Sequence, residues 1–141
     1  MNIKKIICST LVMGTCLVSA VAFAEPTSYQ YFEKGVLSQA RDKVVEAIAY
    51  YDKSVELNPT YAPSFYNRGV CLKAVGEKEK AFADFNKAIE LNEKYVSAYN
   101  KRGEYYLENG DKEKALADFN KALTYAPQNK EALALKAKCG K

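Results

Sequence analysis

Residues of the same kind recur at intervals of 34 positions along most of this chain. Five sets of residues follow that interval: Gly35, Gly69 and Gly103; Ala47, Ala81 and Ala115; Tyr51, Phe85 and Phe119; Ser54, Ala88 and Ala122; and Tyr31, Phe65 and Tyr99. A repeated unit of this length cannot bury its apolar face alone, so neighbouring units must stack to form a continuous core. The interval therefore predicts an array of three similar units, which is about the minimum for stability.

Each unit contains two segments of about a dozen residues with the apolar spacing of a helix. In the second unit the apolar residues stand at i, i+1, i+4, i+7 and i+8, namely Ala81, Phe82, Phe85, Ala88 and Ile89. Arg41-Asp42, Gly76 and Gly110 separate the two segments of each unit and are typical of a turn. Gly35, Gly69 and Gly103 fall inside helical segments, where we expect two helices to approach closely.

The pattern resembles the tetratricopeptide repeat family, whose unit is W-x2-L-G-x2-Y, then A-x3-F, then P. The third unit matches it best, with Tyr99-x2-Arg102-Gly103-x2-Tyr106, Ala115-x3-Phe119 and Pro127. Lys34, Arg68 and Arg102 replace the family's leucine, and we expect their aliphatic stems to imitate it in part. The resemblance implies an all-α fold, a right-handed α-solenoid of three helix-turn-helix units with a C-terminal capping helix.

The same register divides the chain into segments. We expect a signal peptide at residues 1–24, a short N-terminal tail at 25–27, three repeat units at 28–61, 62–95 and 96–129, and a C-terminal capping helix at 130–141. The signal peptide is predicted from Lys4 and Lys5, an apolar run over 6–22, and Ala22-Phe23-Ala24 before Glu25. Cleavage after Ala24 would place the protein in the periplasm or outside a bacterial cell, with a transient membrane contact only. Retention of the segment as a membrane anchor is the alternative.

Composition argues against several classes of function. The chain has no histidine and no tryptophan, and it shows no recognisable catalytic or metal-binding constellation. These absences predict a protein that is not an enzyme and needs no metal or cofactor. Without Lys4 and Lys5, 19 basic residues face 17 acidic ones, so the net charge is +2 and no nucleic-acid partner is expected.

Two cysteines remain outside the predicted signal peptide, Cys71 and Cys139. They occupy the same position in units two repeats apart, on the order of 20 Å from each other, which is too far for an intramolecular disulfide. We expect Cys71 to be a small buried residue and Cys139 to be a thiol near a frayed end, able to pair between molecules.

By the family resemblance, the first helix of each unit lines a concave groove. The expected binding residues there are Tyr29, Phe32, Val36, Tyr66, Asn67, Val70, Lys73, Asn100, Lys101 and Glu104. The hypothesis is that the aromatic and apolar residues at the N-terminal end hold apolar side chains of a peptide or partner helix. Asn67 and Asn100 would hydrogen-bond the partner's backbone. The alternative is that Tyr29 and Phe32 only cover the open N-terminal end of the core.

Chaperone-binding members of the family use Lys and Asn in the first unit to hold an acidic tail, and Phe32 and Val36 stand at those positions here. An acidic chaperone tail is therefore not the expected ligand. The sequence favours a non-catalytic scaffold or adaptor of the cell envelope that binds a protein or peptide. A self-associating structural protein of the envelope is the alternative function.

Overall fold

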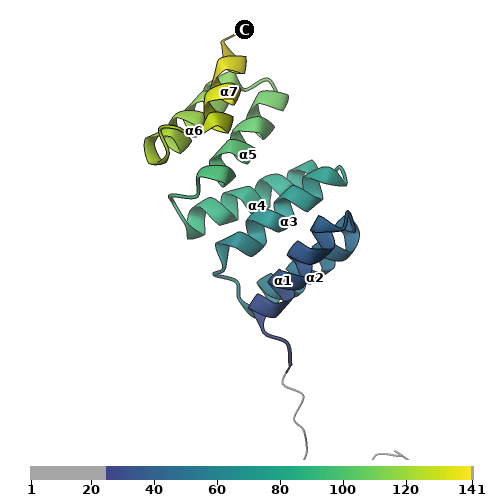
Figure 1. The fold of residues 1–141 in the computed structure, drawn as a ribbon. Helices are drawn as coiled ribbons and strands as arrows, with labels where there is room; N and C mark the ends of the chain where they lie inside the picture. Colours follow the sequence, from purple (N-terminus) through teal and green to yellow (C-terminus); the bar gives the residue numbers. More distant parts are fainter. Residues whose placement is uncertain (1–24, 141) are drawn as a thin grey trace, which may run out of the picture.

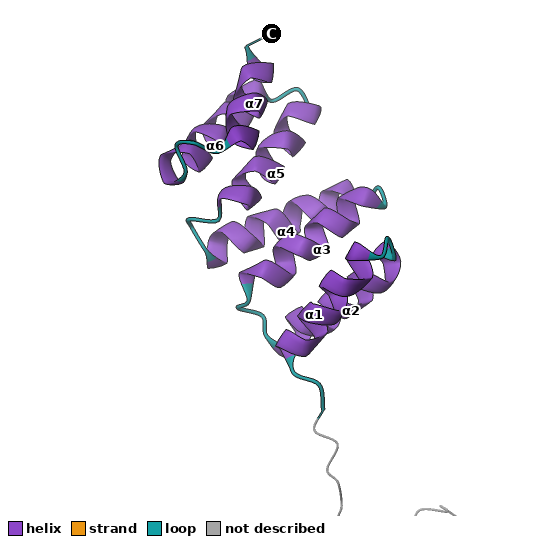
Figure 2. Cartoon of the chain, viewed as in Figure 1, coloured by secondary structure: helices purple, strands orange, loops and turns teal. Residues whose placement is uncertain are grey.

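The computed structural model describes residues 25–140, and these form seven helices without a strand. The helices are α1 (Ser28–Ala40), α2 (Val44–Leu57), α3 (Ala62–Ala74), α4 (Lys78–Leu91), α5 (Val96–Glu108), α6 (Lys112–Tyr125) and α7 (Lys130–Cys139). Figure 1 shows three helix pairs stacked one after another, with α7 against the last pair, and Figure 2 shows that short loops connect them. The expected all-α solenoid with a C-terminal helix is confirmed.

The predictions about export and the membrane concern the N-terminal segment, residues 1–24. The predicted signal peptide lies outside the described residues. Among the described residues, none of the helices has both the length and the apolar character that a membrane span requires.

Each helix pair turns at the same position of its unit, and the backbone there adopts a positive φ. The values are 61° at Asp42, 88° at Gly76 and 81° at Gly110. Glycine takes this conformation without strain, whereas a residue with a side chain does so at a cost. The first pair therefore has the least favourable residue at its turn.

Inside each pair, the glycine of the first helix lies against an aromatic ring of the second. A Cβ atom added to Gly35 would stand 2.5 Å from Cε1 of Tyr51, and one added to Gly69 would stand 2.7 Å from Cε1 of Phe85. Gly103 faces Phe119 in the same way. The expected close approach of two helices is thus confirmed, and the ring of the second helix is what requires it.

Arginines join neighbouring pairs through an arrangement that we call the arginine ladder: Arg68 with Asp84 and Asp52, and Arg102 with Asp118 and Asn86. Nε and Nη2 of Arg68 donate to the two carboxylate oxygens of Asp84 at 2.8 and 2.7 Å, and Nη1 donates to Asp52 of the preceding pair at 2.9 Å. Hydrogen bonding to buried Asp84 raises the pKa of Arg68. A bidentate pair of this kind is stronger and more directional than an ordinary surface ion pair.

Arg102 makes the same contacts as Arg68, with one change. Nε and Nη2 of Arg102 donate to Asp118 at 2.8 and 2.6 Å, and Nη1 donates to the neutral Asn86 of the preceding pair at 2.9 Å. The prediction that these arginines act through their aliphatic stems was therefore incomplete, because the guanidinium groups make the main contacts. The sequence contains the signal, since each arginine precedes an aspartate by 16 residues in both units.

Within the first pair, no arginine–aspartate contact joins α1 to α2. Lys34 stands at the arginine position and Tyr50 at the aspartate position, and Nζ of Lys34 lies 5.3 Å from the ring centroid of Tyr31 and 6.0 Å from that of Tyr50. A cation over an aromatic ring at an exposed site contributes only about 0.5–1 kcal/mol. The first pair is therefore held less firmly than the other two.

Both cysteines are buried and neither is in a disulfide. Cys71 packs against Ala47 and Tyr51, and burial raises the pKa of its thiol. Cys139 packs against Ala115 and Phe119, so the prediction of an exposed thiol at a frayed end is wrong. The last residue of α7 instead completes the core of the third pair.

Candidate functional site

Tyr29, Phe32 and Val36 project from α1 at the N-terminal end of the array. Tyr29 and Val36 remain 56% and 43% exposed. Phe32 is partly buried, and its ring centroid lies 5.9 Å from that of Tyr51 and 5.2 Å from that of Tyr61. Phe32 thus covers the core, as the alternative interpretation expected, whereas Tyr29 and Val36 are available at the surface.

These side chains surround an apolar pocket. It has a volume of about 400 Å³ and is lined by Tyr29, Phe32, Glu33, Val36, Leu37 and Ala40. A single carboxylate, that of Glu33, is the only charge on its wall. A pocket with a mostly apolar wall and one polar group is suited to apolar side chains rather than to a charged ligand.

Tyr66 and Val70 of α3 lie in the middle of the array and are partly buried. The ring of Tyr66 packs between those of Phe85 and Tyr95, with centroid distances of 6.1 and 5.0 Å, and burial raises its pKa. Val70 packs against Phe85 and its neighbours. Both residues therefore have a structural role, with only part of each side chain left for a partner.

Asn67 also projects from α3 and is partly exposed. Its Nδ2 donates to the carbonyl of Pro63, one turn earlier in the same helix, at 2.9 Å. No hydrogen bond to its Oδ1 is formed within residues 25–140, so this oxygen is free to accept one from a partner's backbone.

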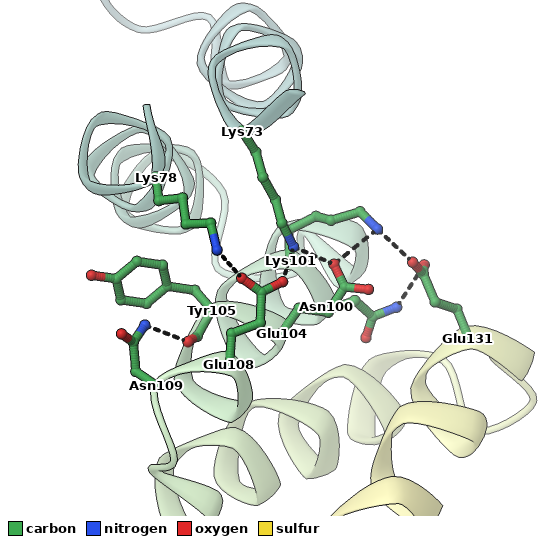
Figure 3. Close-up of polar contacts among 9 residues, drawn as sticks. All are labelled: Lys73, Lys78, Asn100, Lys101, Glu104, Tyr105, Glu108, Asn109 and Glu131. Atoms are coloured by element: carbon green, nitrogen blue, oxygen red, sulfur yellow. Dashed lines mark hydrogen bonds and ion pairs between the residues drawn. The ribbon is translucent and has the colours of Figure 1, made fainter. Parts of the chain in front are cut away.

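Charged side chains from four helices meet at the other end of the expected groove (Figure 3). We call this set the polar cluster: Lys73, Lys78, Lys101, Glu104, Glu108 and Glu131. Lys73 contacts Glu104 at 3.3 Å and Glu108 at 2.8 Å, and Lys101 contacts Glu104 at 3.2 Å. Three of these residues, Lys73, Lys101 and Glu104, were expected to bind a partner, and the structure shows them bound to one another.

Glu131 of α7 joins the cluster from outside the three repeat units. Its Oε1 lies 2.8 Å from Nζ of Lys101, and its Oε2 accepts a hydrogen bond from Nδ2 of Asn100 at 3.0 Å. Burial raises the pKa of Glu131, but the hydrogen bonds from Lys101 and Asn100 lower it by more, and the net shift is downward. The repeat pattern gave no indication of this residue, because its position has meaning only once α7 has packed.

Asn100 is the expected binding residue whose environment differs most from the prediction. It is 0% exposed, and its Nδ2 donates to Oδ1 of Asn129 at 3.1 Å as well as to Glu131. Its Oδ1 is buried without a hydrogen-bond partner among the described residues. Contrary to the expectation, Asn100 is not accessible to a partner's backbone in this conformation.

Comparison with known proteins agrees with the repeat pattern. Three models described as tetratricopeptide repeat match residues 31–61, 62–95 and 96–129. A search of curated protein sequences finds no significant match.

Solved structures give a second comparison. The Arabidopsis OM64 TPR domain is 28% identical, with a TM-score of 0.77 over 81% of this chain and 94% of that one. The first TPR of Spaghetti (RPAP3) bound to the HSP90 peptide SRMEEVD is also 28% identical, with a TM-score of 0.77 over 81% and 90%. The second TPR domain of human RPAP3 in complex with the HSP70 peptide SGPTIEEVD is 25% identical, with a TM-score of 0.75 over 81% and 95%.

Proposed function

Since the chain belongs to the tetratricopeptide repeat family, we propose that it is a non-catalytic scaffold that binds an apolar peptide segment of a partner protein. The observation that carries this proposal is the apolar pocket beside Tyr29 and Val36, which leaves two large side chains exposed. Exposed apolar surface next to a pocket is where binding energy in protein interfaces concentrates. Two of the similar solved structures contain a bound peptide, which supports this class of ligand.

The chemistry of the surface favours an apolar ligand over the acidic tails in those two complexes. Phe32 and Val36 stand where the chaperone-binding members carry Lys and Asn, so these two positions offer no cation to a carboxylate. In the third unit, Lys101 already contacts Glu104 and Glu131. An acidic peptide would have to break these ion pairs, whereas apolar side chains can enter the pocket without displacing any.

The test compares two fluorescein-labelled peptides by anisotropy: one selected by phage display on the purified protein, and SRMEEVD. We expect the selected peptide to be rich in apolar residues and to bind more tightly than the acidic one. Tyr29→Ala and Val36→Ala should each weaken its binding about tenfold, which corresponds to about 1.4 kcal/mol. Val45→Ala is the matched control, because Val45 is 74% exposed on α2 and does not line the pocket.

Two results would contradict the proposal. Equal affinity of the wild type and both pocket variants would place the ligand elsewhere. Tighter binding of the acidic peptide, abolished by Lys101→Ala, would move the site to the polar cluster.

We also propose that the protein acts in a bacterial envelope after export, as an adaptor for a larger assembly. The support is the order of Lys4 and Lys5, the apolar run over 6–22 and Ala22-Phe23-Ala24. Mass spectrometry of protein recovered from the envelope fraction should find a chain that begins at Glu25. A chain that begins at Met1 and partitions into detergent would show instead that the segment is retained as an anchor.

A further inference from the structure

The outward face of α1 occupies a position that a preceding pair covers in the rest of the array. Leu37, Cys71, Tyr105 and Cys139 share one register position, spaced by 34 residues. Cys71 is buried against Tyr51 of the preceding pair, and Tyr105 stacks on Phe82 of the preceding pair at a centroid distance of 4.4 Å. Among residues 25–140 no helix pair precedes Leu37, and its side chain is 50% exposed.

Leu37 forms a ridge between two hollows. One is the apolar pocket beside Tyr29 and Val36, and the other, of about 370 Å³, is lined by Pro26, Gln30, Glu33, Lys34 and Leu37. Leu37 and Glu33 border both hollows. Helices pack when the side-chain ridge of one enters the groove of the other, so this face has the relief that a second helix needs.

Charge is arranged symmetrically about the same ridge. Glu33 precedes Leu37 by four residues within α1, and Arg41, the C-cap residue directly after α1, follows Leu37 by four and still donates its backbone N–H to the carbonyl of Leu37 at 3.2 Å. This spacing places the three side chains along the same side of the helix. Both charged side chains are exposed, and neither takes part in an ion pair within residues 25–140. At about 1.5 Å per residue, each charge lies about 6 Å along the helix from Leu37.

We propose that two copies of this chain pair through α1 in antiparallel orientation, with the two-fold axis at Leu37. In that arrangement Glu33 of each copy is level with Arg41 of the other, so the interface makes two equivalent ion pairs. A two-fold interface requires a patch that complements itself, and this charge spacing satisfies the requirement. A parallel pairing would bring Glu33 against Glu33 and is repulsive.

The pairing goes beyond peptide binding and does not depend on it. A single helix face gives a small interface, so we expect a dissociation constant on the order of micromolar or weaker. Because Leu37 also lines the apolar pocket, the dimer covers part of it. Peptide affinity should therefore fall as the dimer forms.

The test is sedimentation equilibrium of the purified chain, without peptide, over a wide concentration series and with its N-terminus defined by mass spectrometry. The wild type should show a monomer–dimer equilibrium. Glu33→Arg and Arg41→Glu should each weaken the dimer at least tenfold, and the combined variant should regain most of the lost affinity because the ion pairs form again with reversed sign. Leu37→Lys should be monomeric, and Val45→Lys is the control that should leave the equilibrium unchanged.

Circular dichroism first verifies that each variant keeps the helical content of the wild type. A wild type that is monomeric at every concentration overturns the pairing and leaves the peptide site untouched. A dimer that the single charge reversals do not weaken overturns it as well, and shows that another segment, such as residues 1–24, carries the contact. Failure of the combined variant to recover would show that the two charges do not face each other.

Discussion

Replacing Arg102 by leucine changes a residue of the arginine ladder to the residue that the family pattern has at this position. If only the aliphatic stem mattered, the variant would be as stable as the wild type. The structure predicts a large loss instead, because the change leaves the carboxylate of Asp118 buried without its guanidinium partner.

The size of the loss follows from the burial of the two side chains. Asp118 is 7% exposed and Arg102 is 21% exposed, and two hydrogen bonds of 2.6 and 2.8 Å join them. Removing one member of a fully buried pair costs about 3–5 kcal/mol, whereas a surface pair contributes about 0–1 kcal/mol. Because Arg102 keeps some contact with water, we expect Arg102→Leu to lower the free energy of unfolding by about 2–3 kcal/mol.

Urea unfolding followed by circular dichroism measures this change in the free energy of unfolding. Two further variants test whether the buried carboxylate causes it. Arg102→Leu combined with Asp118→Leu should lie within about 1 kcal/mol of the wild type, because an apolar pair replaces the ionic one without leaving a buried charge. Lys34→Leu is the matched control, since Lys34 occupies the same register position opposite Tyr50 rather than a carboxylate. The reasoning is refuted if Arg102→Leu costs no more than Lys34→Leu, or if adding Asp118→Leu makes the loss larger.

The remaining predictions concern packing, pH and thiol reactivity. Gly69→Ala should lower the free energy of unfolding by about 2–3 kcal/mol, because its Cβ would stand 2.7 Å from Phe85; urea unfolding measures this, and an unchanged midpoint would contradict it. The lowered pKa of Glu131 predicts a contribution to stability that is present above the unfolded-state pKa of about 4.3 and is lost as the pH falls through the lower folded-state value. Thermal unfolding should therefore separate the wild type from Glu131→Gln at neutral pH and bring them together in acid, and a constant difference would argue against the ion pair with Lys101. The thiol of Cys71 is buried with a raised pKa, so it should react with a disulfide reagent only after urea unfolds the protein, and rapid reaction of the native protein would contradict the packing.

The fold could be predicted from the sequence because its determinants are local and repeated. The apolar spacing around Ala81 and Phe85 fixes a helix, and the same spacing occurs 34 residues later around Ala115 and Phe119. The turns at Gly76 and Gly110 and the close approach at Gly69 follow from glycine's freedom and size. These features do not depend on how one pair sits against the next.

The polar contacts between pairs could not be predicted in the same way. Lys73 and Glu104 are 31 residues apart and meet only because the stack brings α3 beside α5. Asn100 has a surface position in the family pattern, but it is buried and bonded to Asn129, which caps α7, and to Glu131 of α7. The surface proposed to bind a partner is therefore narrower than the repeat pattern suggests, and its most exposed side chains, Tyr29 and Val36, lie on α1.

Since no arginine–aspartate contact joins α1 to α2, the first pair should be the part of the array that unfolds locally most often. Arg68 of α3 is bonded to α2 and α4, and Arg102 of α5 is bonded to α4 and α6. No such contact joins α1 to α2, because Lys34 faces Tyr50 instead of a buried carboxylate. Backbone amides of α1 and α2 should therefore exchange with deuterium sooner than those of α3 to α6. A peptide or a second copy bound to α1 would stabilise this end of the array. Binding could therefore be followed through slower hydrogen exchange at backbone amides of α1 and α2 that the bound partner does not contact.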